Sequence, residues 1–136
     1  MKTHTTNYED TFIAIAKDSS ATKGTEPDAA KPTIASITFR LIHENPYRFT
    51  SDDVLFMVHA ERKGIPEAKW DQERKAFFAK PQACLRASPL PKTYGWGIHS
   101  DERGRVALYP VESKDYKKLE KSAATVRFAM ASSRAK

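Results

Sequence analysis

Two alternating stretches joined by a short loop with a glycine constrain the fold of this chain most strongly. Residues 94–99 read Tyr-Gly-Trp-Gly-Ile-His, and residues 105–111 read Arg-Val-Ala-Leu-Tyr-Pro-Val. Alternation of this kind is typical of strands, and Gly104 in the loop can adopt the positive φ that a short hairpin connection needs. The sequence therefore predicts an antiparallel sheet that includes a 94–99/105–111 hairpin.

Two segments upstream of the hairpin favour helices. Residues 33–44 carry apolar side chains along one side for three turns, although their centre also alternates like a strand. Thr50 followed by Asp53 is typical of a capping box, and Gly64 is a natural helix stop. We therefore expect helices over residues 33–44 and 50–64.

Further signals complete the predicted fold. Pro66 can begin a helix because its missing N–H costs nothing there, and Ser113 can cap another. Residues 7–16 predict a strand, whereas residues 125–136 fit either a strand or a frayed helix. The whole pattern indicates an α+β fold in which the sheet packs against three to four helices.

The length of 136 residues fits a single domain over residues 1–136 that can bury a core without metal or disulfide support. Residues 17–32 are rich in small and polar side chains with almost no apolar periodicity, so they predict a mobile loop. Residues 123–136 are interpreted as a basic C-terminal tail.

The net charge of +6 is unevenly distributed. Residues 1–112 hold 16 Lys and Arg against 15 Asp and Glu, whereas residues 113–136 hold 7 against 2. A DNA-binding domain usually spreads its basic residues over the face that meets phosphate. The nearly neutral body therefore disfavours nucleic acid as a partner.

The chain shows no sign of membrane insertion or export. It contains no run of 18 or more apolar residues, and its N-terminus, MKTHTTNYED, lacks the apolar core of a signal peptide. A single cysteine excludes an intramolecular disulfide and is typical of a reducing compartment. We expect a cytoplasmic protein without a transmembrane helix.

Motifs for metal, nucleotide or cofactor chemistry are missing from the sequence. Its four histidines form no H-x-x-x-H pair, and no Cys-x-x-Cys occurs. Neither a phosphate-binding P-loop nor a G-x-G-x-x-G element is present. The sequence predicts no metal site and no cofactor.

The hairpin region supplies the candidate ligand-binding residues. On the predicted strand, Gly95 and Gly97 share one face with His99, and that face would be flat and open. Such a face could accept a small anionic ligand or a protein partner. The predicted site consists of Arg86, Trp96, His99, Tyr109 and Glu112. The competing interpretation places Trp96 in the core, pairs Arg86 with Glu112 and leaves His99 solvated.

Two other functions stay open on the sequence alone. Cys84 could be a nucleophile if Arg86 or His99 favoured its thiolate, giving an enzyme with a site assembled around Cys84 and His99. Free cysteines are more often small buried residues. Nucleic-acid binding through the 33–64 helix pair and the basic tail ranks last, because acidic residues on the second helix would repel phosphate.

Three phrases of the chain resemble a known family. They are NYEDTFI, NPYRFTSDDVLFMVHAERK and LRASPLPKTYGWGIHSDERGRVALYPVES. They resemble small bacterial and fungal proteins grouped as a domain of unknown function, from about Thr5 to Leu119. The resemblance implies a single-domain protein, and it implies no activity and no catalytic residue.

Overall fold

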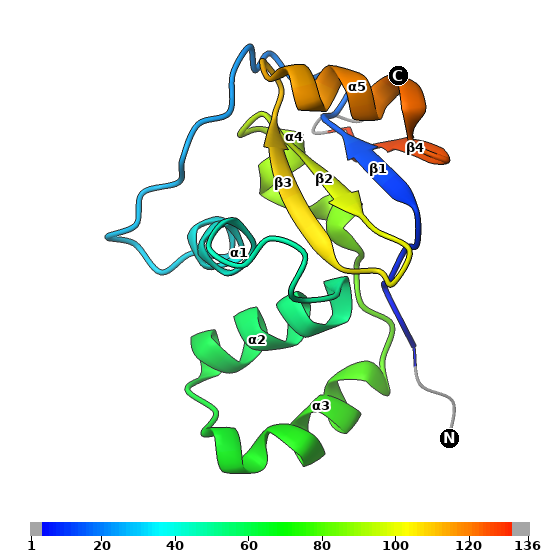
Figure 1. Cartoon of the computed structure of the whole chain (residues 1–136). Helices are drawn as coiled ribbons and strands as arrows, with labels where there is room; N and C mark the ends of the chain where they lie inside the picture. Colours follow the sequence, from blue (N-terminus) through cyan, green and yellow to red (C-terminus); the bar gives the residue numbers. More distant parts are fainter. Residues whose placement is uncertain (1–3, 132–136) are drawn as a thin grey trace.

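A four-stranded sheet organises the computed structural model, which describes residues 4–131 (Figure 1). Its strands lie in the order β3-β2-β1-β4. Their bounds are β1 Thr11–Ala14, β2 Trp96–Ser100, β3 Val106–Pro110 and β4 Thr125–Phe128. With helices on both faces of this mixed, mostly antiparallel sheet, the molecule is a small α+β domain, as the sequence predicts.

The predicted hairpin is confirmed. Strands β2 and β3 pair antiparallel, with Gly97 opposite Tyr109 and Ser100 opposite Val106. The loop between them places Gly104 at φ 77°, in the left-handed region that glycine adopts without a steric penalty. The paired residues are 96–100 and 106–110, so the strands are slightly shorter than predicted.

The first and last strands meet at the other side of the sheet. The strand predicted in residues 7–16 is β1, which pairs antiparallel with β2 and parallel with β4. Strand β4 shows that residues 125–128 are part of the sheet, and Ala129 is buried. Residues 125–129 of the predicted tail are therefore part of the sheet and the core, and residues 132–136 lie outside the described part of the chain.

Three helices begin directly after the predicted capping residues Thr33, Thr50 and Ser113: α1 Ile34–His43, α2 Ser51–Lys63 and α5 Lys114–Ser122. The helix expected from Pro66 starts with a 3-10 turn, so α3 spans Trp70–Phe78, and the short α4 Pro89–Lys92 has no counterpart among the predicted helices. The Thr50 side chain accepts from the backbone N–H of Asp53, whose carboxylate accepts from the N–H of Thr50. Gly64 ends α2 at φ 66°. Local capping chemistry therefore fixes these ends.

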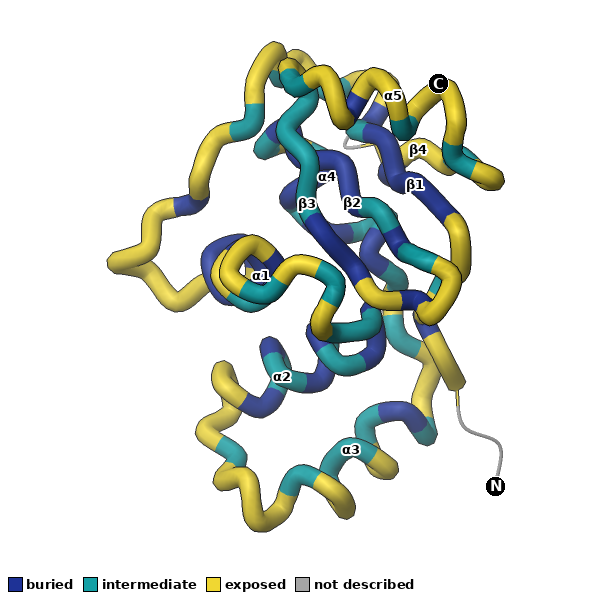
Figure 2. Tube along the Cα trace, viewed as in Figure 1, coloured by how far each residue is buried: buried dark blue, intermediate teal, exposed yellow. Residues whose placement is uncertain are grey.

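Two apolar layers enclose the sheet (Figure 2). On one face, Ile13 and Ile98 pack against side chains of α1 and α2, with Ile37, Ile42, Val54 and Val58 among the buried contacts. On the other face, α5 places Tyr116 against Phe12 and Ala14. Helix α3 packs on α2 through a separate cluster of Phe56, Ala60 and Phe78.

The α5 face depends on a missing side chain at Gly97. A Cβ atom built there would lie 2.5 Å from the Phe12 ring and 2.7 Å from the Tyr116 ring. The two rings meet edge to face with centroids 5.0 Å apart. The Tyr116 hydroxyl also accepts from the N–H of Ile15 at 2.9 Å. Glycine thus lets α5 approach the sheet closely.

Residues 17–32 contain no helix or strand, and they contact the hairpin. The indole N–H of Trp96 donates to the Thr25 carbonyl at 2.8 Å, and the N–H of Thr25 donates to the Tyr94 carbonyl at 2.8 Å. Gly24 lies so close to Trp96 and Pro110 that an added Cβ would sit within 2.9 Å of each. The mobility of the loop stays a prediction.

Replacing Val58 with Asp should destabilise the fold severely. Val58 is 6% exposed in the core between α1, α2 and the sheet, and the substitution would bury a carboxylate among apolar side chains. We expect a loss of more than about 3 kcal/mol in the free energy of unfolding, measured by urea denaturation. The exposed control Lys63→Asp on the same helix should cost less than about 1 kcal/mol. Equal losses would contradict the assignment of Val58 to the core.

Replacing Gly97 with Ala should also destabilise the protein, by about 1–3 kcal/mol, because the new methyl group would overlap two packed rings. Shortening one of these rings should relieve the overlap. The double variant Gly97→Ala, Phe12→Leu should therefore lose less stability than the sum of its single changes. If thermal denaturation shows that the double variant loses as much stability as the two single variants together, the added methyl group does not strain the rings.

Candidate functional site

The structure brings two of the five predicted site residues together. The hydroxyl oxygen of Tyr47 lies 2.8 Å from Nδ1 of His99 and 2.7 Å from the hydroxyl oxygen of Tyr109. His99 and Tyr109 lie on β2 and β3, on the same face as α5. The loop between α1 and α2 supplies Tyr47. The three groups form one hydrogen-bonded chain, here named the Tyr47 cluster.

Tyr47 has an unusual backbone conformation. Its φ of 59° lies in the left-handed region, which is uncommon for a bulky residue that follows a proline. The N–H of Tyr47 donates to the Val106 carbonyl at 2.9 Å, and the N–H of Val106 donates to the Phe49 carbonyl at 2.9 Å. These bonds hold the loop against β3 and aim the hydroxyl across the sheet, so tertiary contacts offset the backbone strain.

The charge state of the Tyr47 cluster follows from its burial. Burial lowers the pKa of His99, and the carboxylates of Asp101, Asp10 and Glu102 oppose that shift. Burial raises the pKa of Tyr47, and its hydrogen bond with Tyr109 adds to the effect. At neutral pH the cluster therefore holds an uncharged His99 imidazole and a protonated Tyr47 hydroxyl. Such a chain can hold or relay a proton at the sheet surface.

The other three predicted residues lie elsewhere. Trp96 is 7% exposed and packs against Phe39 and Leu90, so it belongs to the core. Arg86 donates from Nε to the Phe128 carbonyl at 2.7 Å. Glu112 accepts at 2.8 Å from the N–H of Gly24, which lowers the pKa of its exposed carboxyl. Ligand binding by each of the five residues stays a prediction.

Two geometric expectations are therefore corrected. The glycine face of β2 is covered at Gly97, where Phe12 and Tyr116 occupy the space expected to be open. Arg86, Trp96 and His99 line neither of the two cavities described below. Alternation along a strand predicts which residues share a face. It does not predict which other segments cover that face.

The pairing of Cys84 with His99 is also corrected. The Cys84 sulfur lies 3.4 Å from the Tyr8 hydroxyl, and this contact is the main reason that the pKa of Tyr8 is raised. Within residues 4–131, no hydrogen bond joins Cys84 to an imidazole. Cys84 and His99 therefore have different hydrogen-bond partners, and an enzyme site around them stays a hypothesis.

A cavity of about 430 Å³ opens between α1, α2 and the segment that leads into α4. We name it the α1–α2 cavity. Its walls are mainly apolar. The lining residues are Ile34, Thr38, Leu55, Val58, His59, Arg62, Phe77, Gln82, Ala83, Cys84, Leu85, Ala87, Ser88 and Pro89. A volume of this size suits a small organic ligand.

Few polar groups of the cavity remain available to a ligand. Gln82 donates from Nε2 to the Phe77 carbonyl at 2.7 Å, and Ser88 caps α4. The His59 ring lies against Phe77 with centroids 4.6 Å apart. Arg62 is exposed on the last turn of α2, and no carboxylate of the described residues pairs with it. Arg62 is thus the uncommitted charge of this cavity.

A second hollow lies beside α3 and has a different character. Its lining residues are His4, Thr5, Asp52, Asp71, Arg74, Lys75 and Phe78. The Asp52 carboxylate already accepts from both Thr5 and Thr6, and Arg74 pairs with Asp53 at 2.8 Å. These polar groups bind one another and hold the N-terminal segment on α2.

Sequence reasoning missed the α1–α2 cavity and the role of Tyr47. The helical pattern places Val58 and Arg62 on α2, but the distance between α1 and the 82–89 segment is a tertiary property. The positive φ of Tyr47 leaves no signal in Asn45-Pro46-Tyr47. Residues 4–131 contain no cluster of three candidate metal ligands and no helix suited to crossing a membrane.

Comparison with known proteins identifies one family. A model described as "Family of unknown function (DUF6157)" matches residues 3–135 of the chain. No match is found among curated proteins or among solved structures. The family match spans the sheet, the helices and both sites described above.

The free energy of unfolding should depend on the protonation of His99. Its pKa in the folded state is lowered from 6.5, so the unfolded chain binds a proton more readily. Stability from this group is therefore present above about pH 6.5 and is lost as the pH falls below that value. Urea denaturation across this range should show a larger loss for the wild type than for His99→Gln. Parallel pH profiles would contradict the assignment.

Proposed function

The chain belongs to this family of unknown function, and we propose that it is an intracellular protein that binds a small molecule in the α1–α2 cavity. The ligand class is a molecule with an apolar body and a carboxylate. One observation carries the proposal: mainly apolar walls and an arginine without a carboxylate partner among the described residues occur at the same cavity.

The cavity walls support an apolar ligand body. Leu55, Phe77 and Leu85 contribute large apolar side chains from α2, α3 and the segment before α4. Ile34, on the first turn of α1, also lines the cavity and is 45% exposed. A ligand that covers this side chain would remove apolar surface from water, which contributes favourably to binding.

The charge of Arg62 supports a carboxylate on the ligand. The neighbouring acid Glu61 pairs with Arg40, and Asp53 pairs with Arg74, so both carboxylates are already neutralised. A planar guanidinium binds a carboxylate through two parallel hydrogen bonds. Because Arg62 stays hydrated at the cavity rim, it can meet an anionic group without a large desolvation cost.

Location inside the cell is part of the same proposal. The only cysteine, Cys84, is free and lines the cavity, and free thiols persist in reducing compartments. A cytoplasmic protein of this kind would meet carboxylates with apolar chains as metabolites.

Decanoate should raise the melting temperature of the wild type, and decylamine should not, because Arg62 attracts an anion and repels a cation. Arg62→Gln should weaken decanoate binding about tenfold in titration calorimetry, the loss expected for a charge-assisted contact. Ala83→Phe should abolish binding, since it fills the cavity from an exposed position and spares the core.

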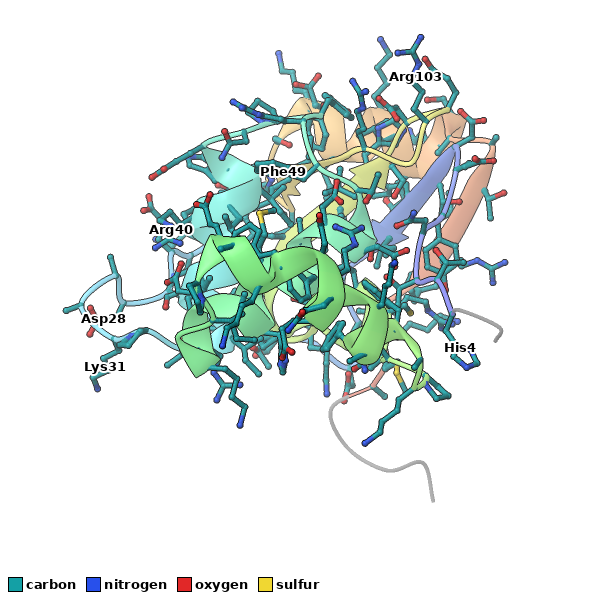
Figure 3. All side chains as sticks on the ribbon, turned by 90° about the horizontal axis from the view of Figure 1, so that it is seen from below. His4, Asp28, Lys31, Arg40, Phe49 and Arg103 are labelled. Atoms are coloured by element: carbon teal, nitrogen blue, oxygen red, sulfur yellow. The ribbon has the colours of Figure 1, made fainter. Side chains whose placement is uncertain are left out.

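Arg103→Gln provides the matched control. Arg103 is an exposed arginine in the hairpin loop, and it projects at the top of Figure 3, away from α2 and α3. Its removal changes the net charge equally and should leave decanoate binding unchanged. If Arg62→Gln and Arg103→Gln bind decanoate equally, or if Ala83→Phe still binds it, the proposed ligand site is wrong.

A further inference from the structure

Strand β4 leaves one side of the sheet open. It is the last strand in the order β3-β2-β1-β4, and Figure 2 shows it far less buried than β1. Thr125, Arg127 and Phe128 are exposed, and Val126 is half-buried. An exposed edge strand carries backbone groups that can pair with another chain.

The direction of these backbone groups follows from the pairing of β4 with β1. The N–H groups of Thr125 and Ala129 donate to carbonyls of Asp10 and Ala14 at the β1 side. Successive residues of a strand direct their backbone N–H and C=O groups to opposite sides. The N–H groups of Val126 and Phe128 therefore point outward. On this outer side, Arg86 donates from Nε to the Phe128 carbonyl, and the N–H of Met130 donates to the Arg86 carbonyl at 2.8 Å. Among the described residues, the outward groups of β4 without a hydrogen-bond partner are therefore the N–H and C=O of Val126 and the N–H of Phe128.

A row of lysines lies on α5, directly before β4 in the chain. Lys114, Lys117, Lys118 and Lys121 are all exposed, and among residues 4–131 none pairs with a carboxylate. At 3.6 residues per turn they fall within about 100° of the helix circumference. Tyr116 and Leu119 face the opposite way, into the sheet. Figure 1 shows α5 and β4 at the same end of the molecule.

We propose that β4 binds an extended acidic segment of a partner protein, which adds a fifth strand to the sheet. The outward N–H and C=O groups of β4 recognise a polypeptide backbone, which neither a nucleic acid nor a lipid headgroup supplies. The lysine row attracts the acidic side chains of the segment. A second copy of the chain is disfavoured as the partner, because it would bring the same positive charge to the edge.

The decisive variant is Phe128→Pro, compared with Phe128→Ala. Proline removes the outward N–H of residue 128 and leaves the ladder with β1 intact, because proline is tolerated at the solvent side of an edge strand. Alanine removes the same ring, which lies 4.7 Å from Nζ of Lys17, and keeps the N–H. The two variants therefore differ in the backbone donor.

The probe is a fluorescein-labelled synthetic peptide of alternating valine and glutamate, added to the full chain and followed by fluorescence anisotropy. We expect Phe128→Pro to bind it at least tenfold more weakly than Phe128→Ala does. Replacing Lys117, Lys118 and Lys121 with Gln should weaken binding to the same peptide at low salt. The amide of Phe128 should gain protection from hydrogen exchange in the complex.

Several results would overturn the proposal. These are no binding of the peptide, equal binding of a valine–lysine peptide, or equal affinities of Phe128→Pro and Phe128→Ala. Binding of an oligonucleotide or of phosphatidylserine vesicles through the same lysines, untouched by Phe128→Pro, would assign the surface to phosphate instead. Self-association that Phe128→Pro abolishes would assign the edge to a second copy. Decanoate binding in all variants tests the α1–α2 cavity separately.

Discussion

The close approach of α5 to the sheet at Gly97 is the constraint on which the fold depends. The rings of Phe12 and Tyr116 meet over this residue, and the Tyr116 hydroxyl continues the contact to the backbone of Ile15. One position without a side chain thus ties together β1, β2 and α5. With that face closed by α5, the opposite face is free to receive α1 and α2, and the α1–α2 cavity forms beside them.

The parts of the fold predicted from the sequence are those governed by neighbours in the chain. Thr50 and Asp53 satisfy each other's backbone groups, and Gly64 and Gly104 adopt left-handed conformations that follow from glycine itself. The expected geometry of the predicted site differs from the structure where distant segments decide the outcome. Alternation placed Gly97 and His99 on one face, but only tertiary packing determines that Tyr116 covers the first and Tyr47 binds the second.

The candidate sites of this domain differ in the interactions that they offer to a ligand or partner. The α1–α2 cavity combines apolar walls with a hydrated guanidinium, whereas the β4 edge offers backbone groups beside a row of ammonium groups. The Tyr47 cluster is different again, because burial favours the uncharged forms of Tyr47 and His99. The first two regions are connected, because Arg86 lies within the 82–89 segment that lines the α1–α2 cavity and also bonds to Phe128 of β4.

The position of β1 has a consequence for how the protein is made. This strand comes from the N-terminal end, yet both of its partners, β2 and β4, come from the last third of the chain. Residues 15–95 must therefore be synthesised before β1 can pair with either neighbour, so the sheet closes through contacts that are distant in the chain. Until then the apolar stretch Thr11–Ala14 stays unpaired. An exposed strand of this kind is prone to aggregation unless a chaperone covers it or folding is fast.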